Sequence, residues 1–576
     1  MHKPSQAIRT FIVLTLVVSA IIFGYPAAFI VQHGWSSAGW PDGLLTPVTW
    51  FTIPIFIIKE HSYLEIGPAL TAYWHMFHSE SPAFAEGGFV AVMFIAGSTA
   101  FLGAIIFFGG TWIPLRDKLD LYGNAKWASK RDRARMNKGL EIGLDPDTQR
   151  PIRIQVEGNL LTIAPPRTGK TGGLIIPNLA LPEQNAWGGP AVVIDPKGDA
   201  YRAVKRRREA LGKKVRCLDP LGLVDGSDRW NPLLRIDPTD VLYLQGMASA
   251  LANEAVQESE AGAFFRNSAA DLIVAAIVTS IKNNRTDIAA AAALLTNPAD
   301  FQRLLERQVD KATGELPAIL RSALGTLTTG DDRTKSNMIE TAKQNTRWLI
   351  DDRMSLVVQN HTFELDELCS GDADLFIVLP ADNRKTILAP YVRWLLADLF
   401  NTVRRNRPAE RIIAFIDEAN VLGRFQELSD AAGELPGYGL SLWTFWQSRF
   451  QLENTYGEAG AEIFMGTAEM TSIFNLPAAQ PDELERWSDA IGNFTVSKPT
   501  NTRDAKTGKT TVSYSPEAAR LAPPTTLQSL LNRWQVVLLN GPAHTPDRLK
   551  LGRVSAYTDT RFEDLIERTQ PVGRIA

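Results

Sequence analysis

The stretch Ala164-Pro-Pro-Arg-Thr-Gly-Lys170-Thr171 decides the fold of this 576-residue chain. The apolar run Leu160-Leu-Thr-Ile-Ala164 leads into it, and Gly172-Gly-Leu-Ile-Ile176 follows it. This order predicts a strand, a phosphate-binding loop and a helix. A polyphosphate needs converging backbone N–H groups, a mobile ammonium group and a hydroxyl group that holds Mg²⁺. The backbone around Gly169 and the side chains of Lys170 and Thr171 meet these needs, so ATP and Mg²⁺ are the expected ligands.

The loop departs from the usual pattern at one position. The pattern G-x-x-x-x-G-K-[ST] begins with glycine, whereas this chain has Ala164, so a methyl group must be tolerated there. A Gly-Lys-Thr tripeptide alone can also be a surface turn before a helix. The predicted nucleotide-binding residues are Ala164, Pro165, Pro166, Arg167, Thr168, Gly169, Lys170 and Thr171.

A second motif favours nucleotide hydrolysis over a surface turn. Arg411-Ile-Ile-Ala-Phe-Ile-Asp417-Glu418 is a continuous apolar strand that ends in two carboxylates. This arrangement places an acid beside Mg²⁺ at the carboxyl end of a parallel sheet. We expect Asp417 to hold Mg²⁺ through water and Glu418 to orient and deprotonate the attacking water. The two motifs in this order predict a P-loop ATPase.

The N-terminal region predicts a membrane anchor. Residues 11–31 are apolar and carry no charge between Arg9 and His33, and residues 89–110 are also long enough to span a bilayer. A cleaved signal peptide is the competing interpretation of the first stretch, but no small-residue cleavage motif follows it. The sequence therefore predicts two transmembrane helices with an external loop between them.

Basic residues around these stretches predict the topology. Lys3 and Arg9 precede the first span, while Lys59 is the only lysine or arginine between the spans. Seven basic residues follow the second span: Arg116, Lys118, Lys126, Lys130, Arg131, Arg133 and Arg135. The positive-inside rule then places both termini and the ATPase in the cytoplasm.

Composition agrees with a membrane-anchored globular protein. The chain is 45% hydrophobic and 21% charged, with a net charge of −3. Its two cysteines, Cys217 and Cys369, predict no disulfide framework, and its seven histidines have no metal-ligand spacing. The basic run at 126–138 is interpreted as charge that faces lipid, and the run at 202–214 as the solvated face of a helix. Neither run indicates nucleic-acid binding by itself.

The remaining pattern predicts a doubly wound α/β protein. Further buried strands are expected at 191–195, 374–379, 440–447 and 534–540, with a helix at 390–404 and a hairpin at 498–514. Residues 240–351 have helical periodicity over a domain-sized length, which predicts an all-α insertion. The predicted division is a membrane anchor at 1–115, a nucleotide-binding domain at 116–239 and 352–576, and an insertion domain at 240–351.

The ordered motifs together resemble a known family, the type IV secretion coupling proteins, or TraG/TraD-type ATPases of conjugation systems. The resemblance covers nearly the whole chain. It is carried by the two N-terminal spans, Tyr122-Gly-Asn-Ala-Lys-Trp-Ala128, the phosphate loop with Ile176-Pro-Asn-Leu179, Asp195-Pro-Lys-Gly-Asp199, Trp230-Asn-Pro-Leu233, Asp417-Glu418-Ala, Gly437-Tyr-Gly439, and Gln447-Ser-Arg-Phe-Gln-Leu452 with Tyr456-Gly457.

The resemblance implies an architecture and further site residues. It implies a RecA-like ATPase domain interrupted by an all-α domain, and a homo-hexameric ring at the bacterial inner membrane. By the same resemblance Gln447 senses the γ-phosphate. Some relatives carry an arginine before the Gly-Tyr-Gly turn that reaches a neighbouring subunit's ATP, whereas this chain has Leu435-Pro436 there. Arg424 and Arg449 are the alternatives, and the sequence does not separate them.

Two functions share this predicted ATPase core. In the first, the protein recruits relaxase-bound single-stranded DNA to the subunits of a type IV secretion channel and drives its transfer by ATP hydrolysis. In the second, it is a receptor for secreted protein effectors without DNA transfer. A scaffold with a degenerate nucleotide site is disfavoured by the intact Lys170, Thr171, Asp417 and Glu418. A septal DNA pump is a more distant alternative, since it would usually carry more spans and a C-terminal winged-helix module.

Overall fold

The computed structural model describes residues 121–180, 183–252, 259–308, 316–329, 331–380, 385–503, 510–530, 533–540 and 547–568. Both predicted spans and the loop between them lie outside these residues, so the anchor at 1–115 stays a prediction. The chain divides into two compact units. Among the described residues, 121–122, 495–503 and 510–518 belong to the first unit and the others to the second.

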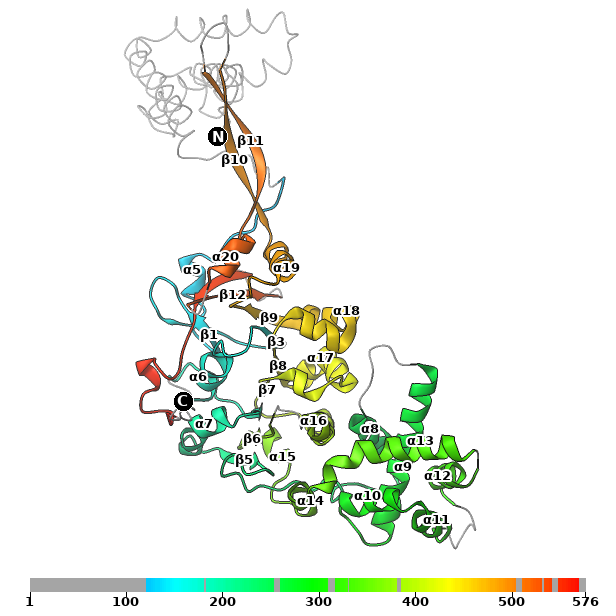
Figure 1. The fold of residues 1–576 in the computed structure, drawn as a ribbon. Coiled ribbons are helices and arrows are strands. Elements are labelled where there is room, and N and C mark those ends of the chain that lie inside the picture. The colour runs from blue at the N-terminus through cyan, green and yellow to red at the C-terminus, as the bar shows by residue number, and fades with distance from the viewer. Residues whose placement is uncertain are drawn as a thin grey trace, which may run out of the picture. The chain divides into compact units, whose positions relative to one another are not determined.

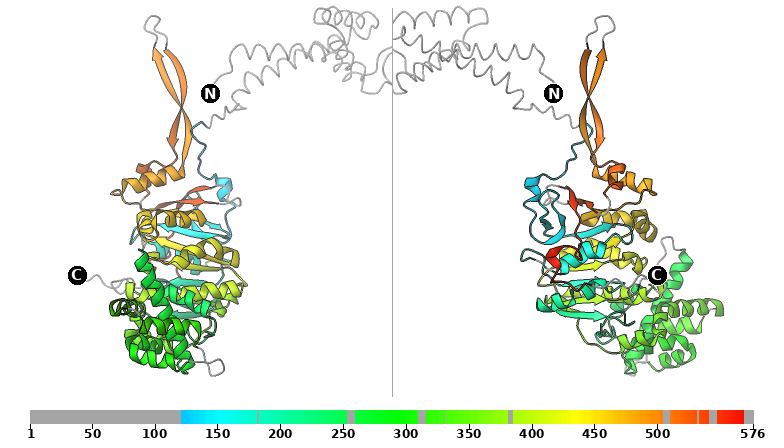
Figure 2. Two further views of the ribbon diagram at one scale, coloured as in Figure 1. Left: turned by 90° about the vertical axis from the view of Figure 1, so that its right-hand side faces the viewer. Right: turned by 60° about the vertical axis from the view of Figure 1, so that its left-hand side comes forward.

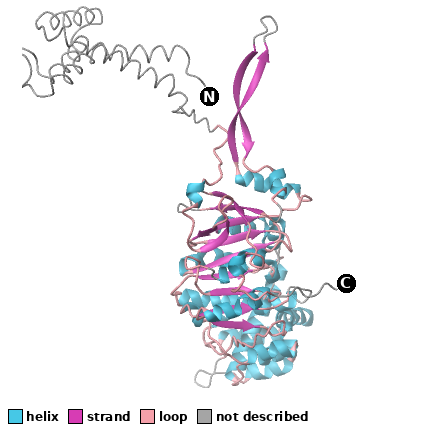
Figure 3. Ribbon diagram, turned by 90° about the vertical axis from the view of Figure 1, so that its left-hand side faces the viewer, coloured by secondary structure: helices cyan, strands magenta, loops and turns pink. Residues whose placement is uncertain are grey.

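The second unit is built on one eleven-stranded sheet, in the order β2-β1-β13-β12-β9-β3-β8-β7-β4-β6-β5 (Figures 1 and 3). The strands are β1 (Leu140–Leu144), β2 (Pro151–Ile154), β3 (Asn159–Ile163), β4 (Ala191–Ile194), β5 (Lys214–Leu218), β6 (Ala373–Ile377), β7 (Ile412–Ile416), β8 (Leu440–Trp446), β9 (Ala468–Ile473), β12 (Trp534–Leu539) and β13 (Arg548–Gly552). The strands predicted at 160–164, 191–195, 374–379, 411–417, 440–447 and 534–540 are confirmed as β3, β4, β6, β7, β8 and β12.

The central strands of the sheet run parallel. Strands β9, β3, β8, β7, β4, β6 and β5 pair in parallel, and β12, β13, β1 and β2 extend the sheet by antiparallel pairs. The carboxyl ends of β3, β8, β7 and β4 therefore lie side by side at one edge. Ligands of open α/β sheets bind at this edge.

Both faces of the sheet are buried, which explains why its central strands are continuously apolar. Leu161 and Ile163 of β3 pack into one core, whereas Leu160 packs into the core on the opposite face. Val192 and Val193 of β4 divide in the same way. Successive side chains of a strand point to opposite faces, so a strand with helices on both sides must be apolar at every position.

Helices cover the two faces (Figure 2). The π-helical turn η2 (Thr171–Ile175), α6 (Ile176–Ala180) and α7 (Asp199–Ala210) contribute to one core, and α16 (Lys385–Arg405), α17 (Gln426–Tyr438) and α18 (Arg449–Thr467) to the other. The predicted helix at 390–404 is part of α16, which contains Pro390. Shorter helices are α5 (Lys130–Arg133), α15 (Asp366–Cys369), η4 (Ala419–Leu422), α19 (Pro481–Ile491), α20 (Pro524–Gln528) and η5 (Thr560–Phe562).

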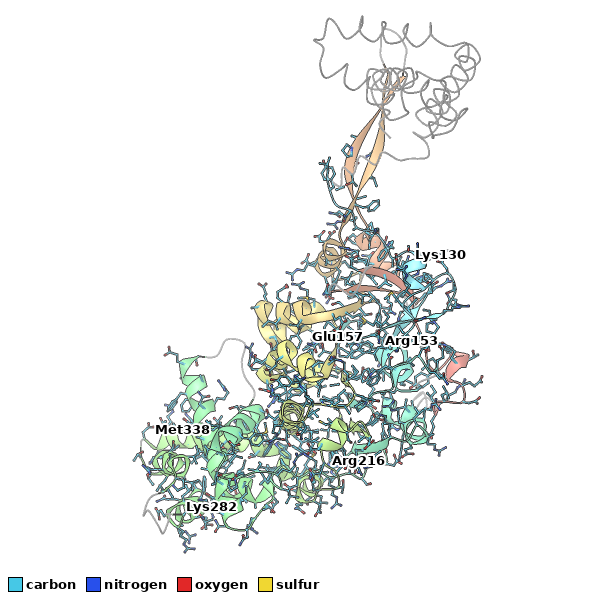
Figure 4. The ribbon with its side chains drawn as sticks, turned by 180° about the vertical axis from the view of Figure 1, so that it is seen from behind. Lys130, Arg153, Glu157, Arg216, Lys282 and Met338 are labelled. Carbon is cyan, nitrogen blue, oxygen red and sulfur yellow. The ribbon has the colours of Figure 1, made fainter. Side chains whose placement is uncertain are left out.

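A run of helices occupies most of the segment between β5 and β6. They are α8 (Val241–Leu251), α9 (Glu260–Lys282), α10 (Ile288–Thr296), α11 (Pro298–Glu306), α12 (Ala318–Thr328), α13 (Asp332–Thr346), η3 (Arg347–Ile350) and α14 (Asp352–Gln359). Figure 4 labels Lys282 at the end of α9 and Met338 on α13 in this region. The border of a separate insertion domain at 240 and 351 stays a prediction.

Helix α9 is the centre of this helical region. Within the described ranges it is the one helix that is long and apolar enough to cross a membrane, by length and composition alone. Leu272, Ile273, Val274 and Ile277 are nevertheless buried in the protein core. A helix that is apolar on all sides can be the central helix of a protein core, and α9 is such a helix.

A two-stranded hairpin follows α19. Its strands are β10 (Asn493–Arg503) and β11 (Thr510–Arg520), so the hairpin predicted at 498–514 is confirmed and extends further at both ends. Lys498 Nζ lies 3.4 Å from Glu517 Oε2 across the two strands. Gly508, near the centre of the predicted hairpin, lies outside the described residues.

The interpretation of the run at 202–214 as a solvated helix face is wrong for Arg208, although Arg206 and Lys214 are exposed. Arg208 of α7 is fully buried and pairs with Asp374, at the start of β6, through Nε–Oδ2 and Nη2–Oδ1 distances of 2.6 and 2.8 Å. Lys205 pairs with Asp225 at 2.6 Å, and Arg206 Nε lies 2.6 Å from Glu567 Oε1. The run therefore joins α7 to other parts of the chain.

The run at 126–138 also needs a correction. Arg133 is buried, and its guanidinium lies 2.6 Å from both Asp145 Oδ2 and Asp147 Oδ2. Lys130, labelled in Figure 4, is exposed and lies 3.6 Å from the Asp147 carboxylate. The arginine is thus a structural residue of the sheet unit, and two carboxylates compensate the charge of its buried guanidinium.

Candidate nucleotide-binding site

The predicted phosphate loop connects β3 to η2. The Ala164 N–H donates to the Trp446 carbonyl of β8 at 2.9 Å, and the Ala164 methyl group is fully buried. The departure from glycine at this position is therefore accommodated by packing. Gly169 has a φ of 78°, in the left-handed region that favours glycine, and Arg167 has a φ of 59°. Thr168 Oγ1 donates to the Pro165 carbonyl at 2.7 Å and closes the loop on itself.

Lys170 folds over this loop. Its Nζ lies 2.8 Å from the Ala164 carbonyl oxygen and 3.2 Å from that of Pro165. Burial lowers the pKa of the ammonium group, and the nearby carboxylates of Asp417 and Glu418 oppose this effect. A phosphate would replace these neutral carbonyl acceptors with a charged one, which makes a stronger hydrogen bond to an ammonium group.

Thr171 and Asp417 meet at the end of the loop. Thr171 Oγ1 donates to Asp417 Oδ2 at 2.7 Å, although the two residues are 246 positions apart. Burial raises the pKa of Asp417, while the Thr171 hydrogen bond and the charges of Lys170 and Lys197 lower it. A hydroxyl group and a carboxylate at this distance form the oxygen donor set that a water-bridged Mg²⁺ requires.

Glu418 and Gln447 form a second pair at the same edge. Gln447 follows β8, and its Nε2 donates to Glu418 Oε1 at 2.7 Å. The Gln447 backbone N–H donates to Gln451 Oε1 at 2.9 Å, which orients the start of α18. Three neighbouring strands, β3, β8 and β7, thus bring together the predicted loop, Gln447 and the Asp417-Glu418 pair.

Arg449, one candidate for the trans arginine, is the first residue of α18, and Arg424, the other, precedes α17. Arg449 lies 2.7 Å from Glu453 Oε1 and is also paired with Glu462. Arg424 donates to the Tyr456 carbonyl at 3.2 Å and to Gln426 Oε1 at 3.3 Å. Both arginines are held by groups of their own chain, and their role towards a neighbouring subunit stays a prediction.

Three residues near the site, Asp195, Lys197 and Arg553, were assigned no role in the site from the sequence. Asp195 follows β4 and is buried, and burial raises its pKa to about 7. Its carboxylate accepts the backbone N–H groups of Asp199 and Tyr201 at the start of α7, and the Tyr201 hydrogen bond partly offsets that rise in pKa. Lys197 lies close enough to lower the pKa of Asp417. The polar turn Asp195-Pro-Lys-Gly-Asp199, which follows a buried strand, could have indicated Asp195 and Lys197. No sequence motif indicates the third residue, Arg553, which donates to the Thr168 carbonyl.

Comparison with known proteins assigns the chain to a family. The family model for type IV secretory system conjugative DNA transfer matches residues 121–572. The chain belongs to this family. The resemblance to type IV secretion coupling proteins that the sequence motifs indicated is therefore confirmed.

Relatives of this coupling protein are distant in sequence. Protein VirD4 of Rhizobium radiobacter is 25% identical over 422 residues, which are 71% of this chain and 58% of that protein. The type IV secretion system-coupling protein VirD4 of Bartonella henselae is 25% identical over 482 residues, 76% of this chain and 73% of that protein. The chain spans 58–60% of the length of the first two relatives that it matches.

Solved structures show the same fold. The bacterial conjugative coupling protein TrwB, in a trigonal form with sulphate, has a TM-score of 0.57 and 18% identity, over 75% of this chain and 94% of that one. TrwB in complex with the non-hydrolysable ATP analogue ADPNP has a TM-score of 0.56 and 16% identity, with the same coverage. These likenesses support the RecA-like α/β fold predicted from the sequence.

Proposed function

We propose that this coupling protein is an inner-membrane ATPase that recruits relaxase-bound single-stranded DNA to a type IV secretion channel and drives its transfer. The observation that carries the ATPase assignment is the meeting of Thr171 with Asp417 and of Glu418 with Gln447 at the carboxyl edge of the parallel strands. The first pair joins segments 246 residues apart, and the second joins the ends of the neighbouring strands β7 and β8. Such a convergence is expected of a nucleotide site and is not needed for the fold alone.

The side chains divide the proposed work. The loop amides around Gly169 and the Lys170 ammonium group bind the phosphates, and Lys170 offsets charge on the terminal phosphate. Glu418 orients the attacking water and takes a proton from it, and Gln447, whose Nε2 donates to Glu418 Oε1 at 2.7 Å, senses the γ-phosphate. An arginine of the next subunit in a homo-hexamer, Arg424 or Arg449, would stabilise charge that develops on the γ-phosphate.

Magnesium fits the donor set at the loop. Thr171 and Asp417 would hold it, the first directly and the second through water, and it would neutralise charge on the β- and γ-phosphates. TrwB, which shares the fold, has been solved with ADP and Mg²⁺. ATP and Mg²⁺ are therefore the ligands that we propose for this chain.

We propose that the protein lies in the bacterial inner membrane with both termini in the cytoplasm. Cysteine labelling tests this topology. A cysteine at Ser37, in the predicted external loop, should react with an impermeant maleimide in intact cells, because that loop contains one lysine and no arginine, while basic residues lie beyond both spans. A cysteine at Glu209, exposed on α7, should react only after permeabilisation. The native Cys217 and Cys369 are buried and give the background. Labelling at Glu209 but not Ser37 in intact cells would overturn this topology.

Single-stranded DNA is expected to stimulate ATP turnover at least about threefold without strong sequence preference, because a translocating motor grips any strand through phosphate charge and stacking. Phosphate release by the full chain in detergent should be measured with oligonucleotides of unrelated sequence at low and moderate salt. Stimulation should weaken steeply as salt rises.

Lys205→Glu should leave the stimulation by DNA unchanged, because Lys205 is already paired with Asp225 within the chain.

The same assay separates DNA transfer from the effector receptor. If no oligonucleotide binds or stimulates while a secreted protein does, the receptor for protein effectors replaces the DNA motor as the better proposal.

A further inference from the structure

A C-terminal strap, residues 553–557, lies against the phosphate loop and the helix that follows it. The Ala556 N–H donates to the Gly172 carbonyl at 2.8 Å. A Cβ at Gly172 would lie 3.1 Å from the Tyr557 ring, and one at Gly173 would lie 2.8 Å from the Val554 carbonyl oxygen. The strap explains the glycine pair after Thr171, which a phosphate loop does not require.

The chain after the strap anchors it to the sheet unit. Arg561 Nη1 and Nη2 lie 3.0 and 2.8 Å from the two carboxylate oxygens of the buried Glu141, and Phe562 is fully buried. The Glu567 N–H donates to the Ala203 carbonyl of α7 at 2.9 Å. This segment, red in Figures 1 and 2, accordingly runs beside α6 and α7. The residues that follow the strap thus fix its C-terminal end to the sheet unit.

Arg553 is the residue of the strap that reaches the loop. Its Nη2 donates to the Thr168 carbonyl, and its guanidinium lies 4.0 Å from the ring centroid of Phe474. Phe474 is buried and its N–H donates to the Ile163 carbonyl at the end of β3. The guanidinium is thus held between the loop and an aromatic ring that the sheet positions.

The charge of Arg553 is desolvated. Burial lowers the pKa of its guanidinium to about 10, so it stays protonated at neutral pH. Within the described ranges, no ion pair or hydrogen bond joins it to a carboxylate. A buried cation without a carboxylate partner is costly, and an anion placed beyond the loop would reduce that cost.

The hydrogen bond also orients a peptide group. In a trans peptide the carbonyl and the following N–H point in opposite directions. Because Arg553 holds the Thr168 carbonyl on one side, the Gly169 N–H is directed to the other side, away from Arg553. Backbone N–H groups of this kind cradle phosphates in such loops.

We propose that Arg553 is a positioning residue of the nucleotide site, which fixes the Thr168–Gly169 peptide towards the phosphates and adds a positive charge behind the loop. This inference rests on the proposed nucleotide binding. We expect the contact to act equally on the bound substrate and on the transition state, so its loss should weaken nucleotide binding and raise KM more than it lowers kcat.

The test compares variants of the full chain in detergent. Arg553→Gln should raise the Kd for ADP and the KM for ATP about 10- to 100-fold, the range for loss of one charge-assisted hydrogen bond, while kcat changes less than about threefold. Arg553→Lys keeps the charge without the planar fork and should recover part of the affinity. Arg533→Gln is the matched control: Arg533 also stacks on an aromatic ring, Trp534, but is exposed, and it should bind as wild type does.

A purely structural role gives a different result. It would lower the melting temperature of the nucleotide-free protein in Arg553→Gln and leave the Kd for ADP unchanged, which would overturn the inference. If Arg553→Gln does not fold, Arg553→Lys decides: we expect a rise in Kd of about three- to tenfold, and an unchanged Kd would again overturn it. Failure of the wild-type chain to bind ADP or ATP would overturn the proposed nucleotide binding, and this inference with it.

Discussion

Glu418→Gln is expected to lower ATP turnover at least about 100-fold, the usual contribution of a general base, and to leave ATP binding nearly unchanged. The amide cannot take a proton from water, but its oxygen can still accept the hydrogen bond that Gln447 Nε2 donates to Glu418. The local geometry should therefore persist in the variant. Phosphate release and equilibrium ATP binding, both on the full chain, measure the two effects separately.

Two further variants make this result specific. Lys170→Ala should weaken ATP binding itself, because the ammonium group meets phosphate charge already in the ground state. Glu458→Gln changes an exposed glutamate of α18 in the same chemical way and should leave turnover unchanged. Normal hydrolysis by Glu418→Gln would refute the assignment of Glu418 as the general base.

Asp374→Ala is expected to cost about 3–5 kcal/mol in the free energy of unfolding, the range for removing one partner of a buried ion pair. Asp374 and Arg208 have fully buried side chains, and Asp374 Oδ1 also accepts the Ala191 N–H at the start of β4. The variant leaves the Arg208 guanidinium buried without its carboxylate. Thermal unfolding of the full chain should begin at a clearly lower temperature.

A matched pair and a double variant test this explanation. Lys205→Ala removes a pair on the same helix, Lys205–Asp225, whose side chains are 30% and 70% exposed, and should cost no more than about 1 kcal/mol. Replacing both buried partners, as in Arg208→Met with Asp374→Leu, should recover much of the loss, because no charge is left unpaired. Equal destabilisation by Asp374→Ala and Lys205→Ala would contradict the account.

The candidate site was largely predictable because its chemistry is local in sequence. Lys170 and Thr171 belong to one short motif, and Asp417 and Glu418 end one apolar strand. Parallel strands place their carboxyl ends at one edge, so the meeting of these two motifs could be expected before any contact was known. The hydrogen bond between Thr171 and Asp417 agrees with that expectation.

Charge runs were less informative than strands. The run at 202–214 has the composition of a solvated helix face, yet Arg208 is among the largest fully buried side chains. Its partner Asp374 lies 166 residues away in the sequence, at the start of strand β6. Composition describes how many charges a helix carries, and only its packing against the sheet determines which of them is buried.

The sequence by itself determined the α/β class, the family and the order of the motifs that follow the central strands. Hydrophobic periodicity and phosphate-loop chemistry depend on a few neighbouring residues, so a local pattern reveals them. Only the tertiary structure decided which distant groups support the loop. Arg553 reaches the Thr168 carbonyl across 385 residues, and nothing near Arg553 in the sequence marks it. Its position follows from antiparallel pairing of β13 with β12 and from close approach at Gly172 and Gly173. Such contacts depend on the register and packing of the whole sheet, which no local pattern encodes.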